Sequence, residues 1–445
     1  MKLEFVNHSS VIVDGGGERL LCDLWLDGRA FDDGWALLSP SVHTARDLES
    51  ARWLWFSHEH PDHFNPPNLR AMPEAQRRAT TVLYQRTVDR RVAKFCEGLG
   101  FPVRELGPDE WMDIGGAEVL VRPHPASWGE GDSWLAMRAG GVTLLNLNDC
   151  EVETEAQARA IRDAVGPVDV LLTQFSYASW QGNPEAKAGR RRYGQELMEH
   201  IRMRAEVLGA RYVVPFASFV WFCHEENAYL NDDMNDIADV ARFIEAHTAA
   251  KAVVLYPGDV WTVGDVHDNT AALTRYAHDR EATRRAAPAT SPRVEAQVLV
   301  QQAQAFCKRL TDGVDPRLTR LYLGVRGLRS GGPKTLPRRV MGGLRVLGGL
   351  RPGGLEPVFV HVSDLGVSFR FDLDGGLTVD GRPAGECDIA LGSAALSYAL
   401  RFPWGGETLQ VNGRFREPAV HDDGQRWSRA NRLLKYFRLG RRRSF

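Results

Sequence analysis

The sequence predicts an α/β fold in which two sheets pack face to face with helices outside, followed by a smaller α+β domain. Two observations carry this prediction. Over residues 1–285, short apolar strand patterns alternate with longer segments that repeat apolar residues every three or four positions. After residue 286, strand patterns separated by Asp-Gly turns predominate. The length of 445 residues suits two or three domains, each with its own core.

The first domain, residues 1–285, alternates strands and helices. The strand candidates are short and apolar: Lys2–Val6, Ser10–Val13, Leu20–Asp23, Trp53–Phe56, Glu118–Arg122, Thr143–Asn146, Val168–Thr173, Tyr212–Pro215 and Ala252–Tyr256. The helix candidates have one apolar face: Asn68–Ala79, Thr87–Leu99, Thr154–Val165, Lys187–Leu208 and Asp232–His247. This order indicates a sandwich of two sheets with helices outside.

A linker and an accessory domain follow. Residues 280–293 are rich in Ala, Pro, Ser, Thr and charge, as linkers are, which places the boundary near residue 285. The C-terminal domain, residues 286–445, is predicted to hold a helix near Val294–Leu310 and strands and hairpins over residues 357–415. Residues 321–355 are rich in glycine and basic residues. This composition fits either a mobile loop that contacts an anionic ligand or a solvated surface loop.

The composition excludes several classes of protein. Lys+Arg 55 against Asp+Glu 57 gives no overall attraction to nucleic acid or to anionic membranes. No apolar run approaches the ~20 residues that span a bilayer, and the N-terminus lacks the pattern of a signal peptide. The six cysteines are scattered and form no C-x-x-C pair, which favours a reducing, cytoplasmic location over a zinc ribbon or a cysteine-bound cluster.

The most informative segment follows the predicted strand that ends at Phe56. It contains four potential ligands within six residues, in a chain with only 13 histidines: His58, His60, Asp62 and His63. A tight turn after a strand lets the first two histidines point to one side and brings the other two ligands to a second position. Imidazole and carboxylate groups suit Zn²⁺, Fe²⁺ or Mn²⁺. The sequence therefore predicts a metal site with an open coordination position.

This H-x-H-x-D-H pattern resembles the signature of the metallo-β-lactamase superfamily, whose fold is an αββα sandwich with one or two metals at the sheet edge. The segments Asn7–Ser10 and Leu21–Leu26 are similar to that superfamily's opening hairpin. The resemblance covers residues 1–285. It implies that Asp149, after a predicted strand, is a bridging ligand. His8 is expected in the substrate pocket or beside the ligands.

Further motifs resemble CMP-N-acetylneuraminate hydroxylase and its bacterial relatives. These are Gly28-Arg29-Ala30-Phe31-x-x-Gly34-Trp35, Asn146-x-Asn148-Asp149-Cys150, the segment 215–227 and the segment 397–413. That hydroxylase carries a Rieske iron–sulfur domain before its lactamase-like domain. This sequence holds no C-x-H…C-x-x-H pair, so a Rieske or ferredoxin electron donor is expected to be a separate protein. The C-terminal domain also faintly resembles sterol carrier modules.

Two histidine positions depart from the superfamily pattern. The third-motif candidate, His124, is two positions out of register, and the fifth motif has Ala217 where a histidine is usual, with His224 nearest. For both histidines, substrate binding or core hydrogen bonding is the alternative to metal binding. The full set of candidate ligands is His58, His60, Asp62, His63, His124, Asp149 and His224.

Two mechanisms fit such a site. In an oxygenase, two metal ions, iron first with zinc or manganese as alternatives, use O₂ and electrons from a partner. In a hydrolase, metal-bound hydroxide attacks an ester, amide or phosphodiester, and Asp62 orients or deprotonates the water. The altered ligand set favours the oxygenase, and a degenerate ligand-binding module is the third alternative. The catalytic candidates are Asp62 and His8.

The substrate implied by the resemblance is a small polar molecule of the nucleotide or sugar type. Aromatic rings near the motifs can stack on a ring or a sugar face, and a basic residue early in the long predicted helix can meet an anionic group. Core packing and solvation are the respective alternatives. The candidate substrate-binding residues are Trp35, Trp128, Trp221 and Arg190.

Overall fold

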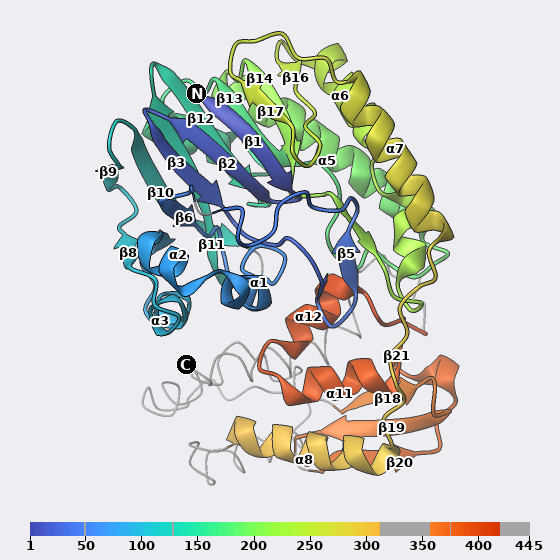
Figure 1. Cartoon of the computed structure of the whole chain (residues 1–445). Helices are drawn as coiled ribbons and strands as arrows, with labels where there is room; N and C mark the ends of the chain where they lie inside the picture. Colours follow the sequence, from blue (N-terminus) through green and yellow to red (C-terminus); the bar gives the residue numbers. More distant parts are fainter. Residues whose placement is uncertain (49, 127–128, 312–356, 374, 419–445) are drawn as a thin grey trace, which may run out of the picture. The chain divides into compact units, whose positions relative to one another are not determined.

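The computed structural model describes the whole chain except residues 49, 127–128, 312–356, 374 and 419–445, and it divides into two compact units (Figure 1). The first unit comprises Met1–Gln181, Ala186–Cys223 and Ala228–Pro288. The second comprises Gly182–Glu185, His224–Asn227 and Ala289–Phe445. A single boundary at residue 285 therefore omits two short segments of the second unit. Backbone pairing holds one of them there, since the Glu225 N–H donates to the Ala289 carbonyl oxygen.

The first unit contains two seven-stranded sheets. The first sheet has the order β17-β1-β2-β3-β6-β7-β8. Its strands are β1 (Lys2–Asn7), β2 (Ser10–Gly15), β3 (Glu18–Cys22), β6 (Trp53–Trp55), β7 (Thr81–Gln85), β8 (Val103–Leu106) and β17 (Val260–Thr262). Strands β17, β1, β2 and β3 pair antiparallel, whereas β3, β6, β7 and β8 run parallel.

The second sheet has the order β16-β14-β13-β12-β11-β10-β9. Its strands are β9 (Trp111–Asp113), β10 (Glu118–Ala126), β11 (Gly129–Ala139), β12 (Val142–Asn148), β13 (Val170–Gln174), β14 (Tyr212–Phe216) and β16 (Lys251–Ala252). An antiparallel meander from β9 to β12 is followed by the parallel strands β12, β13, β14 and β16. The parallel strands therefore all end at one edge of the sheet.

Helices cover the outer faces of both sheets. The helices of the first unit are α1 (Pro66–Ala71), α2 (Glu74–Ala79), α3 (Arg91–Gly98), α4 (Glu155–Val165), α5 (Lys187–Leu208), α6 (Ile237–His247) and α7 (Thr270–Arg285), with a 3₁₀ turn η1 (Ala228–Asp233). The first sheet packs outward on α1 and α3, and the second packs on α4 to α7. The predicted αββα sandwich is confirmed.

The inner strands of the first sheet are largely buried on both faces, whereas the edge strands β17 and β8 have exposed positions. Val11 and Val13 on β2 and Trp55 on β6 face the core between the sheets, whereas Ile12 and Leu54 face the layer against α1 and α3. Successive side chains of a strand point to opposite faces, so a strand buried on both sides is apolar at nearly every position. This explains the continuous apolar runs in the sequence.

Several boundary predictions are wrong, and three of them have a cause visible in the structure. The helix expected over Asn68–Ala79 is two helices, because Pro73 lacks an N–H and holds Met72 in extended conformation with ψ of 134°. The strand expected over Ala252–Tyr256 ends with β16 at residue 252, since the Val254 N–H donates to Oδ1 of Asn269. Helix α7 continues to residue 285, so the expected linker over 280–293 begins inside a helix.

A small third sheet, β15-β5-β4, completes the first unit. It consists of β4 (Arg29–Ala30), β5 (Trp35–Leu37) and β15 (Val220–Phe222). The turn between β4 and β5 has three consecutive residues with positive φ: Phe31 at 53°, Asp32 at 54° and Asp33 at 55°. Residues other than glycine rarely adopt this left-handed conformation, so such a run is unusual.

The second unit is α+β, as predicted. Its sheet has the order β20-β19-β18-β21, and α8 packs against β20 and α11. The elements are α8 (Ala296–Thr311), β18 (Val358–Val362), β19 (Val367–Asp372), β20 (Gly376–Asp380), η4 (Ala384–Glu386), β21 (Ile389–Leu391), α11 (Ser393–Arg401) and α12 (Gly405–Asn412). The hairpin expected near residues 405–413 is instead helix α12, which ends at Gly413 in the left-handed conformation with φ of 66°. The basic segment 321–355 lies outside the described residues.

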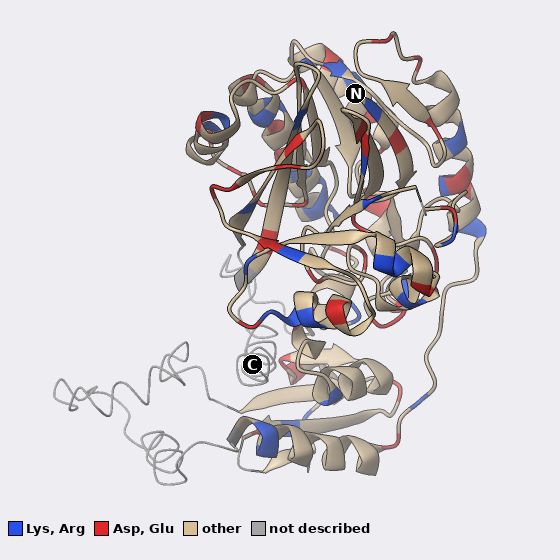
Figure 2. Ribbon diagram, turned by 60° about the vertical axis from the view of Figure 1, so that its left-hand side comes forward, with Lys and Arg blue, Asp and Glu red and all other residues tan. Residues whose placement is uncertain are grey.

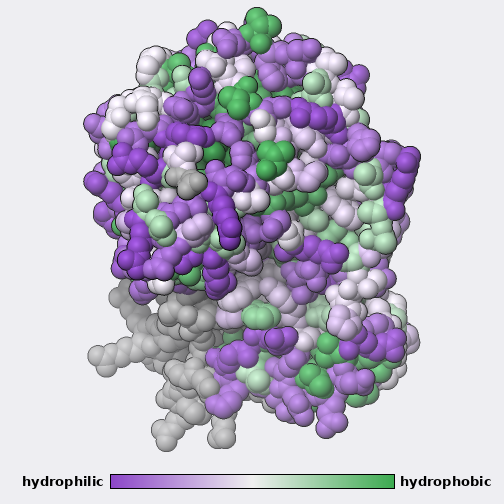
Figure 3. All heavy atoms as spheres, in the orientation of Figure 1, coloured by the Kyte–Doolittle hydropathy of each residue, from purple (hydrophilic) through white to green (hydrophobic). Residues whose placement is uncertain are grey.

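The surface carries charges of both signs. Lys and Arg alternate with Asp and Glu along the helices and loops in Figure 2, and the face in Figure 3 is largely hydrophilic with small scattered hydrophobic groups. This pattern agrees with the balanced composition. Among the residues that the structure describes, no helix is both long and apolar enough to cross a membrane.

Candidate metal centre

The histidine-rich segment lies where β6 ends. Beyond β6 the chain makes a tight turn in which the His63 N–H donates to the His60 carbonyl oxygen at 3.0 Å. The turn is tied to the end of β3 by Asp23, whose Oδ1 accepts a hydrogen bond from the Ser57 N–H at 2.8 Å. This turn and the hydrogen bond from Ser57 to Asp23 together hold the imidazoles of the segment over one edge of the first sheet.

The first group of potential ligands contains His58, His60 and Asp149. Nε2 of His58 lies 2.8 Å from Nδ1 of His60 and 3.7 Å from Oδ2 of Asp149. Asp149 follows β12, so the end of the second sheet meets the end of the first here. The same Oδ2 lies 3.6 Å from Nε2 of His63. Asp149 therefore stands between this group and a second one.

The second group contains His8, Asp62 and His63. Oδ2 of Asp62 lies 3.3 Å from Nε2 of His8 and 3.2 Å from Nε2 of His63. His8 follows β1 with φ of 39°, and its carbonyl oxygen accepts a hydrogen bond from the Ala217 N–H at 3.0 Å. Ala217 stands where the superfamily pattern has a histidine, so His8 supplies the imidazole on this side of the second group.

A hydrogen-bonded layer below the groups orients the imidazoles. Oδ2 of Asp23 accepts from Nδ1 of His63 and from Oγ of Ser57, both at 2.8 Å. Oγ of Ser57 lies 3.0 Å from Nδ1 of His58. The Nδ1 atoms of these two histidines are thus engaged from below, which leaves Nε2 of each facing the two groups. Metal-binding histidines are typically fixed in this way.

Burial and neighbouring charges shift the pKa values of His63 and Asp62 in opposite directions. Burial lowers the pKa of His63, but Asp62 and two further carboxylates outweigh it and hold that pKa well above its ordinary value. Burial raises the pKa of Asp62, yet His63 holds it well below its ordinary value. Burial also lowers the pKa of His60 to about 4 and raises that of Asp149 to about 6. Opposed shifts of this kind are typical of functional sites.

At this edge of the described structure, three buried carboxylate oxygens lack a hydrogen-bond partner: Oδ1 of Asp62, Oδ1 of Asp132 and Oδ1 of Asp149. Such orphaned atoms are rare in folded proteins, and bound cations are one of their explanations. The donor set of imidazole nitrogens and carboxylate oxygens suits Fe²⁺, Mn²⁺ or Zn²⁺. The side chains present therefore fit a pair of metal ions.

Sequence reasoning missed Asp132. This residue is buried on β11, and its Oδ1 lies 3.8 Å from Nδ1 of His58. Burial, and then the neighbouring Asp149, raise its pKa well above the ordinary value. Its one indirect signal is that it pairs with His124 across β10 and β11, which becomes visible only when the register is known.

Two predicted ligands lie outside both groups. Nε2 of His124 lies 3.1 Å from the carbonyl oxygen of Glu151. His224 belongs to the second unit, where its Nε2 lies 3.1 Å from Oγ of Ser291. The structure thus does not bring His124 or His224 together with the other five predicted ligands.

The predicted substrate-binding residues are scattered. Arg190 is buried in α5 with its Nε 2.9 Å from Oδ2 of Asp233. Trp35 is buried on β5, while Trp221 on β15 is half-buried. Trp128 lies outside the described residues. Among the three described residues, Trp35 is connected to the centre through ring contacts, since its ring lies 4.7 Å from that of Phe31, which in turn contacts His60.

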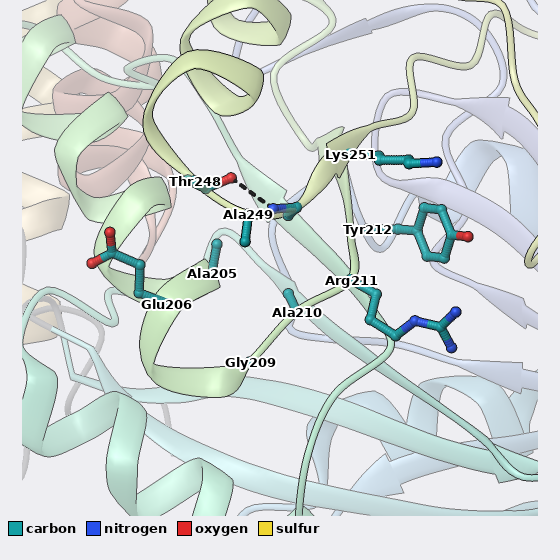
Figure 4. A pocket seen from close by; sticks show the side chains of 10 residues that line it. Ala205, Glu206, Gly209, Ala210, Arg211, Tyr212, Thr248, Ala249 and Lys251 are labelled. Atoms are coloured by element: carbon teal, nitrogen blue, oxygen red, sulfur yellow. Dashed lines mark hydrogen bonds between the residues drawn. The ribbon is translucent and has the colours of Figure 1, made fainter.

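A surface pocket of about 450 Å³ lies away from these groups (Figure 4). It opens where β14 and β16 begin, whereas Ala217 beside His8 follows the end of β14. None of its lining residues belongs to either ligand group. The largest side chains around it are Glu206, Arg211, Tyr212 and Lys251.

Comparison with known families agrees with this geometry. Residues 2–192 match the family model of the beta-lactamase superfamily domain. The matched residues contain both ligand groups, from His8 to Asp149, and the predicted resemblance to the metallo-β-lactamase superfamily is confirmed.

Curated relatives extend the comparison. A protein of Mycobacterium tuberculosis named as a Rieske 2Fe-2S iron-sulfur protein is 27% identical over 54% of this chain and 48% of its own length. The cytidine monophosphate-N-acetylneuraminic acid hydroxylase of Mus musculus is 24% identical over 59% of this chain and 47% of its own length. The predicted likeness to this hydroxylase is confirmed. The chain spans about half the length of the curated relatives it matches.

The chain is also similar to a solved structure. CmlA, a diiron beta-hydroxylase from Streptomyces venezuelae, is 18% identical and covers 58% of this chain and 53% of its own, with a TM-score of 0.42. A likeness at this level supports no conclusion about activity.

Proposed function

We propose that this chain is a metal-dependent oxygenase of the hydroxylase type that holds two iron ions at the sheet edge. The observation that carries this proposal is the position of Asp149. Its Oδ2 lies 3.7 Å from Nε2 of His58 in one group and 3.6 Å from Nε2 of His63 in the other. With metal bound, the Asp149 carboxylate would be a ligand available to both groups. The two ions would be held by His58, His60 and Asp149, and by His8, Asp62 and His63.

The ligand types favour iron. Each group offers two imidazoles and one carboxylate, which is the ligand set of non-haem iron oxygenases when open positions remain. The bound ions would supply the reduction of O₂ with electrons from a partner. Zinc and manganese accept the same donors, so the identity of the metal is the first quantity to measure.

Exposure distinguishes the two groups. All three residues of the second group are buried, whereas His60 and Asp149 of the first are partly exposed. Substrate and O₂ would therefore approach the first group. Asp62 is ionised at neutral pH because His63 holds its pKa down, so it can bind a cation without first losing a proton. His63 holds a proton that a cation displaces.

The relatives support the remaining parts of the proposal. One is named for a Rieske cluster and another for hydroxylation of a nucleotide sugar. We therefore propose a Rieske or ferredoxin electron donor and a small polar substrate of the nucleotide or sugar type. The stacking role of Trp221, half-buried on β15, stays a prediction. Arg190 is not proposed for this role, because Asp233 already pairs with it.

A metal-dependent hydrolase is the second candidate. The observation that favours it is the side-by-side arrangement of the two groups, since two-metal centres also activate water for attack on esters, amides or phosphodiesters. In that reaction Asp62, ionised beside His63, would orient the water. The two candidates differ in metal and in redox activity, so one preparation separates them.

Metal analysis of protein purified without chelators tests the proposal. We expect about two irons per chain and a visible absorption change on reduction and exposure to O₂. In the double variant His58→Ala/His60→Ala the iron content should fall. His278→Ala removes an exposed histidine and serves as the matched control that should keep it. Zinc with turnover of a chromogenic ester or phosphodiester would favour the hydrolase. A metal-free chain would leave only a ligand-binding module.

A further inference from the structure

The left-handed turn between β4 and β5 is a costly conformation with no role in the ligand set. Phe31, Asp32 and Asp33 have φ between 53° and 55°, a region that L-residues avoid and that phenylalanine tolerates poorly. Strained backbone of this kind persists where the surroundings over-determine it, often beside functional sites. The turn belongs to the Gly28–Trp35 motif, which neither ligand group uses.

Several contacts fix the turn. The Gly34 N–H donates to the Phe31 carbonyl oxygen at 3.1 Å and closes it. The Cys223 N–H donates to the Gly34 carbonyl oxygen at 3.0 Å, and the Cys223 Sγ lies 3.2 Å from the Asp33 carbonyl oxygen. The turn is thus anchored to the end of β15, and it cannot relax without breaking these bonds.

The anchored turn aims the ring of Phe31 at the metal centre. The ring lies edge-on to the imidazole of His60, with centroids 5.6 Å apart and planes at 71°. Behind it stands Trp35, 4.7 Å away, and behind Trp35 stands Phe222, 5.6 Å away. Phe31 is buried with an exposed fraction of 4%. The Phe31 ring is therefore in contact with Trp35 and with one candidate ligand, His60. The ring of Phe222 contacts Trp35.

His60 differs from the other two histidines of its segment. Nδ1 of His58 contacts Oγ of Ser57, and Nδ1 of His63 contacts Oδ2 of Asp23. Nε2 of each histidine is therefore available to a metal. His60 instead turns Nδ1 toward Nε2 of His58, at 2.8 Å. The Nδ1 of His60 thus faces His58 and not the hydrogen-bonded layer, while the ring of Phe31 contacts the His60 imidazole directly.

We propose that Phe31 is a positioning residue of the metal centre, whose edge-to-face contact holds the His60 imidazole with Nδ1 directed at the first ion position. This inference rests on the proposed metal centre. The left-handed conformation of the turn places the Phe31 ring against the His60 imidazole. Loss of the ring frees the imidazole to rotate, which weakens the first position. The second position, held by His8, Asp62 and His63, keeps its ligands.

Cobalt titration of metal-free protein tests this proposal, with a chelator in competition. In Phe31→Ala we expect one equivalent of Co²⁺ to bind as in the natural chain and the other to bind about 2- to 12-fold more weakly, the range that corresponds to loss of an edge-to-face aromatic contact. Phe31→Tyr keeps the ring edge and should restore both. Phe222→Ala makes the same truncation two rings away and should retain both. Unchanged affinity for both equivalents in Phe31→Ala would overturn the proposal.

A second variant and a metal-free measurement complete the test. If Phe31→Ala does not fold, Phe31→Leu keeps most of the volume without an aromatic edge, and the same selective weakening is expected. If the natural chain binds no Co²⁺, the proposed function fails, and the positioning is then measured without metal. Modification of His60 by diethyl pyrocarbonate, mapped by mass spectrometry, should be faster in Phe31→Leu while His278 reacts as before. An unchanged rate at His60 would refute the contact's role.

Discussion

Replacement of Asp23 by asparagine should weaken metal binding although Asp23 belongs to neither ligand group. Asp23 is fully buried, and its Oδ2 accepts from Nδ1 of His63 and Oγ of Ser57 at 2.8 Å. Asparagine replaces one of the two acceptor oxygens with an amide that donates. Its single oxygen can then serve only one side of the network, so either the imidazole or the Ser57 backbone loses its acceptor.

The magnitude follows from these contacts. Loss of a carboxylate that orients a metal-binding histidine typically costs 10–100-fold in affinity, about 1.4–2.7 kcal/mol. Breaking a buried pair by removing one partner costs about 3–5 kcal/mol in folded stability. We therefore expect Asp23→Asn to bind Co²⁺ 10–100-fold more weakly at the His63 position and to unfold at lower denaturant concentration when metal-free.

Chelator competition provides the affinity, and urea denaturation of the metal-free protein provides the stability. Asp14→Asn is the matched control, because it makes the same change on β2 of the same sheet, remote from both groups. It should leave both quantities unchanged. An affinity within about threefold of the natural chain in Asp23→Asn would refute the reasoning, since orienting contacts rarely matter so little.

Three further predictions concern stability. Asp33→Gly should raise the free energy of unfolding by up to about 1 kcal/mol, because glycine accepts the φ of 55° without strain; a loss in urea denaturation would contradict this. Leu145→Ala on β12 truncates a side chain with 0% exposure and should cost about 2–5 kcal/mol in the same assay. The folded-state pKa of Asp62 lies well below 3.8, so its ionised form contributes stability that is present above that pH and lost as pH falls. Asp62→Asn should accordingly flatten the acid side of the stability profile of the metal-free chain, and an unchanged profile would count against the ion pair with His63.

Much of the fold could be predicted from local patterns. The nine predicted strands of the first unit overlap observed strands because apolar runs with turn residues between them are local signals. The long strand β11 and the strands β7, β8 and β9 were not predicted. Helix α5 has the predicted bounds, Lys187–Leu208. The errors have local causes too. Pro73 divides a helix, and α12 forms where an alternating pattern indicated a strand, ending at Gly413.

The candidate site was predictable only in part. The cluster from His58 to His63 is contiguous, so no knowledge of the fold was needed to notice it. Asp149 came from the resemblance to a family. Asp132 could not be found in either way, because its approach to His58 depends on how β11 lies against the loop after β6. The burial of Arg190 against Asp233 likewise joins distant segments.

By itself, the sequence determined the layered α/β class, the position of the metal-binding turn and the ordinary charge balance, because these depend on spacing, residue type and counts. Only the tertiary structure decided which side chains share a site. It brought His8 from the end of β1 beside Ala217, set Asp149 between two groups and assigned His224 to the second unit. The physical reason is that strand register and the partners of buried charges are set by contacts between distant segments, which no local periodicity records.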